Sequence, residues 1–337
     1  MKPGKLPHAL LAKLLAGLAA DDPRVVVGPR VGEDAAAIAF GDRLLLAKTD
    51  PITFATDLIG WYAVNVNAND IACMGGEPRW FMATLLLPER ATQKEISAIF
   101  AQIGEACRGL GVTAVGGHTE ITLGIDRPVL VGCMLGEVER EGLVTSGGAR
   151  PGDALILSAP IAIEGTALLA REVGEELVVK GVSEGCVARA RNLLFAPGIS
   201  VVGAARAALQ AGGVTALHDP TEGGLATGLL EMSLASGVGL EVEEEAIPVL
   251  PETREVCAAL GLEALGLIAS GSLLIAAQRE AAEGTVEALR EAGGEAAIIG
   301  RALGEGEACW LMSQAGELRP LLGFARDELA RFLEGRK

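Results

Sequence analysis

The sequence is poor in aromatic side chains and in positive charge, and each shortage excludes a class of protein. Phe, Trp and Tyr make up 3% of the 337 residues, with a single tyrosine, which argues against platforms for stacking nucleic-acid bases. Asp and Glu number 44 against 28 Lys and Arg, so the formal net charge is −16. A nucleic-acid binder needs cations to neutralise phosphates. We therefore expect no nucleic-acid partner.

Long apolar runs and paired cysteines are also missing. No run reaches the roughly 20 residues of a membrane helix, and Lys13 interrupts the apolar stretch 9–20, unlike the unbroken core of a signal peptide. The six cysteines form no CxxC pair, which favours buried thiols over disulfides or a zinc site. We expect a cytoplasmic protein with no membrane attachment. Leucines at four-residue spacing instead predict an amphipathic first helix: Leu6, Leu10, Leu14 and Leu18.

With 337 residues, the chain is long enough for two domains. Half of its residues are hydrophobic, which suffices for a buried core in each. Strand and helix signals mix without a sustained βαβ period, which favours an α+β fold. The Gly- and Pro-rich stretch 146–153 predicts a boundary between domains 1–148 and 149–337. We expect strands at 43–49, 79–87, 112–115, 128–138, 154–158, 238–242, 271–276 and 296–300. We expect helices at 58–74, 92–109, from 164, and at 183–194, 198–212, 223–236 and 279–292.

Three aspartates stand where folding rules alone would not put them. Asp34 follows a glycine turn at Gly32, Asp50 follows a strand, and Asp70 lies in a helix that should bury an apolar face. The same helix carries Asn67 and two further asparagines, which are poor helix formers. One such Asp would be a cap or part of a buried hydrogen-bond network. Three beside glycine turns favour Mg²⁺, which takes one or two carboxylates together with substrate phosphates.

A second polar cluster, GGHTEI at 116–121, follows the predicted strand 112–115. Gly116 and Gly117 would let backbone N–H groups approach a phosphate, and Thr119 would add a hydroxyl. A Gly-Gly pair alone is most often only a turn. His118 is either a donor to a ligand or an ordinary turn histidine, and both interpretations stay open.

A third cluster opens the stretch 218–242. Asp219, Pro220 and Thr221 are typical of a helix start, and Gly223 with Gly224 would expose backbone N–H groups there as an anion site. The alternative is an ordinary cap before a packed helix, which does not explain so many polar residues and glycines together. Walker A, kinase-loop and GxGxxG motifs are absent, so a nucleotide would be held without a common phosphate motif.

Taken in order, these segments resemble the AIR synthase (PurM-like) superfamily, most closely its hydrogenase-maturation branch, HypE. The segments are VGEDAAAI, KTDP, VNVNANDIACMGG, GGHTEI, ARPGD and DPTEGGLATGLLEMSLASGVGLEV, within about residues 25–300. The resemblance implies a PurM-like two-domain α+β fold, in which N-terminal strands join a partner's in a dimeric β-barrel. It also implies ATP with Mg²⁺, used to phosphorylate or activate an amide- or carbonyl-type oxygen of a small or protein-borne acceptor.

The resemblance also assigns expected roles to residues of this sequence. It implies that Asp50 and Asp70 are catalytic. It implies a metal site made of Asp34, Asp50, Asp70 and Glu120. It implies nucleotide contacts by Lys5, Gly32, Asp34, Thr49, Asn67, Gly116, Gly117, His118, Thr119, Asp219, Thr221, Gly223 and Gly224.

The departures from this pattern concern the second substrate. The sequence ends LARFLEGRK where the resemblance expects a cysteine-bearing tail, and Cys309 lies 28 residues before the end. His118 replaces an acidic residue, for which Glu120 is the candidate substitute. Glu164 stands where the branch has histidine, and Ser270 lies where it has a carboxylate. We expect the residues that bind ATP and Mg²⁺ to be retained and the acceptor substrate to differ. The alternatives are a thiamine-monophosphate-kinase-like small-molecule kinase and a non-catalytic nucleotide-binding assembly factor.

Overall fold

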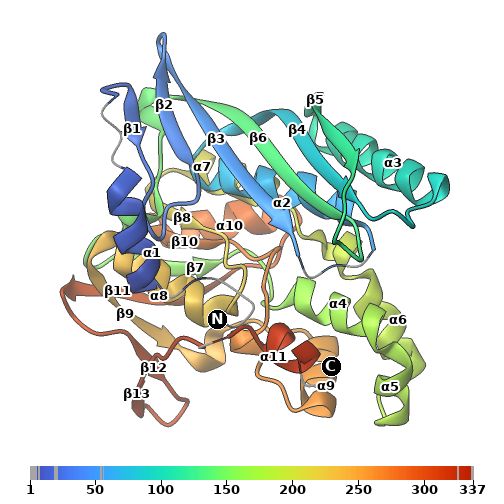
Figure 1. The fold of residues 1–337 in the computed structure, drawn as a ribbon. Coiled ribbons are helices and arrows are strands. Elements are labelled where there is room, and N and C mark those ends of the chain that lie inside the picture. Colours follow the sequence, from blue (N-terminus) through green and yellow to red (C-terminus); the bar gives the residue numbers. More distant parts are fainter. Residues whose placement is uncertain are drawn as a thin grey trace. The chain divides into compact units, whose positions relative to one another are not determined.

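The chain divides into two compact units, each with its own mixed sheet and helices (Figure 1). The structure, a computed structural model, describes residues 6, 8–18, 22–53, 55, 57–324 and 326–334. Unit 1 comprises Met1–Leu18, Arg30–Glu33 and Val144–Lys337, and unit 2 comprises Ala19–Pro29 and Asp34–Leu143. The expected α+β class is confirmed.

Unit 2 is built on a six-stranded sheet in the order β1-β2-β3-β6-β4-β5. Neighbouring strands are antiparallel except for β4 and β5, which run parallel and leave β5 at the edge. The strands are β1 (Val25–Val27), β2 (Ala36–Phe40), β3 (Arg43–Ile52), β4 (Glu77–Leu87), β5 (Thr113–Ile121) and β6 (Val129–Glu139).

Helices α2 (Ile59–Cys73) and α3 (Gln93–Leu110) complete unit 2, as the sequence predicts. α3 begins with a capping box between Thr92 and Glu95 and ends at Gly111 in the left-handed conformation. α2 packs on β3 and β6, and α3 packs on α2. Almost every residue of α2 is buried, so its asparagines and Asp70 are held inside the unit.

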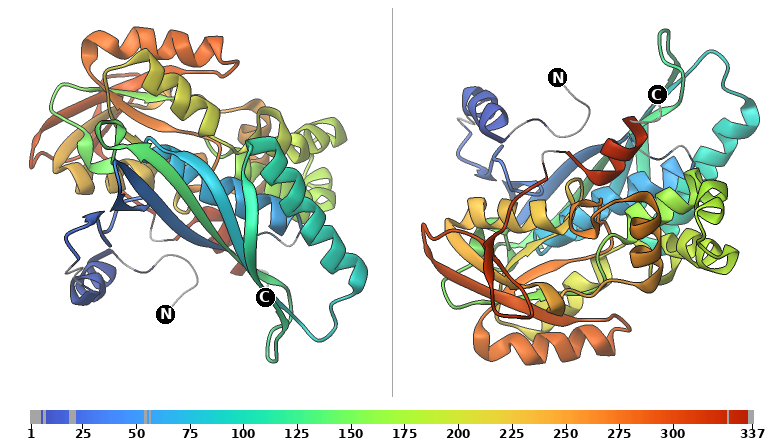
Figure 2. Two further views of the ribbon diagram at one scale, coloured as in Figure 1. Left: turned by 90° about the horizontal axis from the view of Figure 1, so that it is seen from above. Right: turned by 90° about the horizontal axis from the view of Figure 1, so that it is seen from below.

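In the left view of Figure 2 the strands of this sheet lie in front of α2, and the face opposite α2 carries half-buried apolar side chains. Side chains of a strand alternate between its two faces, so the residues that alternate with the buried Leu44 and Leu46 point away from α2. Leu45, Met82 and Leu135 lie at such positions and are half-buried.

Unit 1 contains a seven-stranded sheet in the order β13-β12-β9-β11-β7-β10-β8. Both β7 and β10 are buried at every position, because α7 and α10 pack beside the strands and α8 packs on β8 and β9. The strands are β7 (Ala154–Leu157), β8 (Val214–His218), β9 (Val238–Glu243), β10 (Leu274–Ala277), β11 (Ala297–Glu305), β12 (Trp310–Met312) and β13 (Leu318–Pro320). The helices are α1 (His8–Leu15), α4 (Ile163–Glu172), α5 (Gly174–Val179), α6 (Glu184–Asn192), α7 (Val202–Ala211), α8 (Gly224–Ser236), α9 (Pro251–Leu260), α10 (Ala282–Glu291) and α11 (Glu328–Glu334).

One stretch, Leu194–Ala211, is long and apolar enough to cross a membrane by length and composition. It is not one continuous helix, because a short π-helical segment ends at Gly198 and α7 starts only at Val202. α7 buries Val202, Ala205 and Ala208 and contacts α10 and β8.

Several expected boundaries were wrong, and two of them matter for the site. β3 continues past residue 49 to Ile52, so Asp50 lies inside the strand. β5 continues past residue 115 through the whole GGHTEI motif to Ile121. Smaller differences are that α6 ends at Asn192, α7 starts at Val202 and β10 starts at Leu274.

The expected first helix forms as α1, but its leucines do not enter a core. Leu6, Leu14 and Leu18 are 37%, 55% and 65% exposed. The amphipathic pattern therefore predicted the helix correctly, and Leu14 within it is exposed in the single chain.

Candidate functional site

In unit 2, one lysine lies between two of the predicted aspartates. The Nζ atom of Lys48 is 3.1 Å from Oδ1 of Asp70 and 3.4 Å from Oδ2 of Asp50. Lys48 and Asp50 share the face of β3 that meets α2, because they are two residues apart on the strand. Asp70 reaches them from α2 and is 6% exposed in its side chain.

The electrostatics of this cluster keep Lys48 charged. Burial alone lowers the pKa of Lys48, but Asp70, Asp50 and Asp34 outweigh it and hold the pKa above its usual value. Asp34 is itself 7% exposed. The three carboxylates thus surround a single ammonium group.

Asn67 fixes the backbone of β3 at Asp50. Its Oδ1 accepts a hydrogen bond from the Asp50 N–H at 2.9 Å, and its Nδ2 donates to the Asp50 carbonyl at 3.4 Å and to Ala63 at 2.8 Å. β2 pairs with β3 only as far as Ala47, so the Asn67 amide supplies bonds that a neighbouring strand would otherwise make. The burial of Asn67 in α2 is therefore explained by its hydrogen bonds to the backbone of β3, as well as by its expected contact with the nucleotide.

The charge balance of this cluster suits a divalent cation. Three carboxylates and one ammonium leave two negative charges, and carboxylate oxygens are the ligands that Mg²⁺ prefers. Asp50 remains 35% exposed in its side chain, so it can still reach a ligand. Lys48 adds a cation of the kind that binds phosphate as a point charge. The residues present thus fit Mg²⁺ together with a phosphate.

Thr49, an expected nucleotide contact, points to the other face of β3. It alternates with Lys48 and Asp50 along the strand, and its hydroxyl donates to the Gly132 carbonyl at 2.8 Å. The structure therefore separates Thr49 from the aspartates beside it in sequence.

The GGHTEI motif forms an exposed edge strand instead of the expected loop. Asp50, Gly132, Ala83 and Gly117 are successive register partners across β3, β6, β4 and β5. Three strand spacings put Gly117 about 14 Å from Asp50 within one protomer. A Cβ at Gly117 would lie 2.0 Å from the Ala83 carbonyl oxygen, so this glycine permits close strand pairing.

His118 and Glu120 bond to each other on β5. Nε2 of His118 lies 3.1 Å from Oε2 of Glu120, and the side chains are 65% and 51% exposed. Hydrogen bonds from Thr122 and His118 lower the pKa of Glu120. Within one protomer Glu120 lies beyond β4 from Asp50, because the motif continues as strand. Gly116 and Thr119 lie on the same edge strand.

In unit 1, a carboxylate of the chain itself occupies the glycine turn before α8. The N–H of Gly223 donates to Oδ2 of Asp327 at 2.7 Å. Burial raises the pKa of Asp327 to about 6, against the opposing effect of this hydrogen bond. The glycine turn that the sequence predicts as an anion site thus holds the side chain of Asp327.

The alternative interpretation of this stretch as an ordinary side-chain cap was wrong. Gly223 is the N-cap residue of α8, with φ 85°, and a glycine has no side chain to cap the helix. A Cβ at Gly224 would lie 2.4 Å from the Leu265 carbonyl oxygen, so α8 approaches the backbone of that segment closely. Asp219 is 2% exposed, and Thr221 is half-buried with its carbonyl accepting the Gly224 N–H.

His218 lies beneath this turn in a buried polar group. Its Nε2 is 3.1 Å from Oε2 of Glu231, and its Nδ1 is 3.5 Å from the Ser146 hydroxyl. Gly32 packs on the same helix, since a Cβ there would lie 3.0 Å from the Glu231 carbonyl oxygen. These contacts give His218 and Gly32 structural roles at the base of α8.

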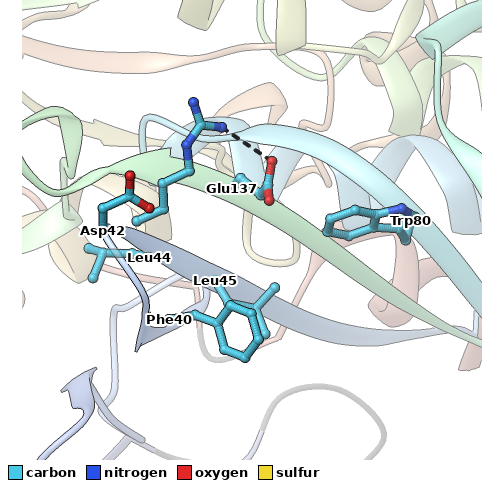
Figure 3. Close-up of a pocket in the computed structure, with 7 residues that line it drawn as sticks. Phe40, Asp42, Leu44, Leu45, Trp80 and Glu137 are labelled. Atoms are coloured by element: carbon cyan, nitrogen blue, oxygen red, sulfur yellow. Dashed lines mark hydrogen bonds and ion pairs between the residues drawn. The ribbon is translucent and has the colours of Figure 1, made fainter.

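A separate hollow of about 360 Å³ lies at the tip of the β2–β3 hairpin (Figure 3). Phe40, Leu45 and Trp80 line it, and an ion pair between Arg43 and Glu137 crosses it. It contains none of the predicted site residues. Lys5, a predicted nucleotide contact, lies outside the described residues.

Lys48, Asp327 and Ser270 have no role predicted from the sequence. The alternation of Leu44, Leu46 and Lys48 along one strand face was a signal for Lys48, because it places a lysine in line with buried leucines. Asp327 joins Gly223 from 104 residues away, and no local pattern reveals such a contact.

Comparison with known proteins matches both halves of the chain to one family. The model of the AIR synthase related protein N-terminal domain matches residues 32–138, and that of its C-terminal domain matches residues 150–309. Carbamoyl dehydratase HypE of Cupriavidus necator is 33% identical over 287 residues, covering 82% of this chain and 78% of its own length.

Two solved structures resemble the whole fold. The HypE–HypF complex contains a chain that matches with a TM-score of 0.75 and 25% identity, covering 93% of this chain and 99% of that one. Hydrogenase maturation protein HypE in complex with ATP matches with a TM-score of 0.72 and 25% identity, covering 94% and 91%.

Proposed function

Because this chain belongs to the AIR synthase related family, we propose that it uses ATP and Mg²⁺ to activate an amide-type oxygen, as a HypE-like carbamoyl dehydratase does. The observation that carries this proposal is the cluster of Lys48 with Asp50 and Asp70. Phosphoryl transfer depends mainly on positioning and on neutralised oxygen charge, and this cluster offers both.

Each residue of the cluster has a proposed task. Asp34, Asp50 and Asp70 would hold Mg²⁺, which would neutralise charge on the phosphates of ATP. Lys48 would bind a phosphate oxygen as its carboxylate partners turn to the metal. Asn67 would keep Asp50 in position, because it bonds both the N–H and the C=O of that residue.

The remaining predicted contacts are proposed for other parts of the nucleotide. Asp219, Thr221, Gly223 and Gly224 would contact it from unit 1 once an anion replaces Asp327 at the glycine turn. Gly116, Gly117 and Thr119 are about 14 Å from Asp50 in one protomer, so they would reach a different part of the nucleotide than the phosphate held there.

The acceptor would be supplied by another molecule. None of the six cysteines is exposed, and burial raises the pKa of Cys107, Cys133, Cys186 and Cys257. Reactive thiols need a low pKa and access to solvent. We therefore propose that a carbamoylated thiol comes from a small molecule or from a protein partner; a HypE–HypF complex is among the structural relatives.

We further propose that the protein is a cytoplasmic homodimer. The apolar open face of the six-stranded sheet, with Leu45, Met82 and Leu135, is the surface on which a second copy would pack. The hollow beside Trp80 lies on this side of the unit and would be filled in the dimer.

The test of the function is ATP turnover with S-carbamoylcysteine as the acceptor. We expect ADP and a dehydrated S-cyano product in equal amounts, only with Mg²⁺, and at least a hundredfold less in Asp50→Asn. The exposed Asp126→Asn serves as the matched control. ADP formation independent of the acceptor, or a dehydrated product without ATP, would contradict the proposal.

A further inference from the structure

Lys48 lies in the unit 2 cluster as a cation that the chain itself supplies. Its ammonium group forms ion pairs with Asp70, at 3.1 Å, and with Asp50, at 3.4 Å. Asp34 adds a weaker attraction, so all three aspartates act on this one group. A divalent cation bound to the same carboxylate oxygens would therefore compete with Lys48 for them.

The carboxylates of this cluster are held more firmly than the lysine. Asp70 projects from α2, which is buried along nearly its whole length. Asn67 bonds both the N–H and the C=O of Asp50, which fixes the backbone that carries the second carboxylate. Lys48 has a flexible four-carbon stem and a compact charge, so its ammonium group can turn to another anion. When a ligand enters the cluster, Lys48 is the side chain that must move.

An ammonium group displaced from the aspartates needs another anion. The side chain of Lys48 is 21% exposed, and a largely buried charge without a partner is costly. A metal that engages all three aspartates leaves Lys48 no carboxylate of the cluster. A phosphate bound to the same metal would supply the missing anion, because Mg²⁺ takes substrate phosphates among its ligands.

The charges of the separate ligands lead to the same result. A free metal ion is attracted by the three carboxylates but repelled by the ammonium group of Lys48. A free phosphate is attracted by Lys48 but repelled by the carboxylates. When both bind, the metal pairs with the carboxylates and the phosphate pairs with Lys48, so each ligand removes the repulsion that opposes the other.

We propose that Lys48 makes this site select a metal-complexed oligophosphate over the free metal ion and over the free phosphate. This inference rests on the proposed function, which assigns Mg²⁺ and the phosphates of ATP to the cluster. Without phosphate, the ammonium group competes with the metal for Asp50 and Asp70. With phosphate, it leaves these carboxylates to the metal and binds the phosphate. By linkage, the phosphate strengthens metal binding by the same factor as the metal strengthens phosphate binding.

The first experiment titrates Mn²⁺, which also prefers oxygen ligands, into the nucleotide-free protein and measures the free ion by electron paramagnetic resonance. Lys48→Met should bind Mn²⁺ about 5- to 150-fold more tightly than wild type, the usual range of such coupling, because the competing ammonium group is gone. Lys48→Arg keeps the positive charge and should bind Mn²⁺ no more tightly than wild type. Lys180→Met, which removes an exposed pair with Glu176, is the matched control and should leave Mn²⁺ binding unchanged.

The second experiment measures the binding of tripolyphosphate by calorimetry, with and without Mg²⁺, after correction for the complex that the two form in solution. Wild type should bind tripolyphosphate about 5- to 150-fold more tightly with Mg²⁺ than without it. With Mg²⁺ present, Lys48→Met should bind tripolyphosphate more weakly than wild type, because the phosphate has lost its ammonium partner. The substitution thus shifts the two ligands in opposite directions, whereas a merely structural lysine would weaken both.

A double variant shows where the extra Mn²⁺ binds. Lys48→Met combined with Asp50→Asn should lose the gain in Mn²⁺ affinity, because one of the freed carboxylates is then missing. Should Lys48→Met not fold, Lys48→Gln replaces it in every measurement, since its amide can still donate hydrogen bonds to the carboxylates.

Three results would overturn the inference. They are Mn²⁺ binding by the neutral variant no tighter than by wild type, a joint weakening of Mn²⁺ and tripolyphosphate, and a gain that persists in the double variant. The proposed function is judged separately. If the binding results are as expected but wild type makes no ADP with S-carbamoylcysteine, the proposed function fails while the selectivity of Lys48 stands.

Discussion

Lys48 is the residue on which the unit 2 site depends, because its one ammonium group forms ion pairs with the carboxylates of both Asp50 and Asp70. Asp70 is almost fully buried, so its charge is tolerable only beside a cation. The same need would create the proposed affinity for Mg²⁺, since a metal could compensate part of the carboxylate charge. Stability and ligand binding are therefore linked at this residue.

Lys48→Met should lower the free energy of unfolding by about 3 kcal/mol without Mg²⁺, because the carboxylate of Asp70 is left buried without its cation. Added Mg²⁺ should restore part of this loss. Urea unfolding with and without Mg²⁺ measures both effects. The control Lys180→Met removes an exposed pair with Glu176 and should change the free energy by less than about 0.5 kcal/mol. Equal effects of the two substitutions would refute the account of Lys48.

The buried carboxyl of Glu164 should make the protein less stable as the pH rises. Its pKa is raised from 4.5 to about 8 by folding, so the folded state holds the proton more tightly, and this stabilisation is complete below pH 4.5 and lost by about pH 8. Glu164→Gln should gain stability over wild type by about 1.4 kcal/mol per pH unit within that window. Urea unfolding at about pH 5 and about pH 8 measures the difference, and a gap that does not change with pH would contradict it.

At the residue scale, the sequence singled out the aspartates that cluster around Lys48 but not the lysine itself. Asp34, Asp50 and Asp70 were identifiable because acidic residues in apolar surroundings require compensation. Thr49 was predicted beside Asp50 because the two are neighbours in the motif. Both lie in β3, where consecutive side chains point to opposite faces. Asp327 and Ser270 act over long sequence distances, which single-sequence patterns do not report.

At the scale of elements, β5 differs most from expectation, and glycine explains why. Gly-Gly predicted a turn, but here it lets an edge strand approach β4 without a side chain between the two backbones. The lengths of α2 and α3 were predicted closely, because hydrophobic periodicity and the capping box at Thr92 are local signals. Strand pairing is non-local, so the sequence alone did not place β5.

Gly117→Ala should destabilise the protein by about 3 kcal/mol, because a Cβ there meets the Ala83 carbonyl oxygen and φ is 147°. Gly116→Ala is the matched control, since a Cβ at Gly116 meets nothing within 4 Å. Thermal unfolding should show a lower melting temperature only for Gly117→Ala. The opposite order would mean that β5 is not paired as described.

At the scale of the whole molecule, the apolar open face of the six-stranded sheet is the surface proposed to bind a second copy. Leu135→Glu, at the centre of this face, should convert a dimer to a monomer in light scattering, because a charge would be buried between the protomers. Leu123→Glu is the control, because Leu123 is 78% exposed and lies outside the sheet strands. A wild-type monomer, or a dimer unaffected by Leu135→Glu, would refute the proposed interface.

The most direct test of the central claim is calorimetric titration of ATP into the protein with and without Mg²⁺, on wild type, Asp50→Asn and Asp126→Asn. We expect binding that requires Mg²⁺, is lost in Asp50→Asn, and is unchanged in Asp126→Asn. ATP binding of equal strength without Mg²⁺, or in Asp50→Asn, would contradict the assignment of the Lys48, Asp50 and Asp70 cluster as the metal–phosphate site.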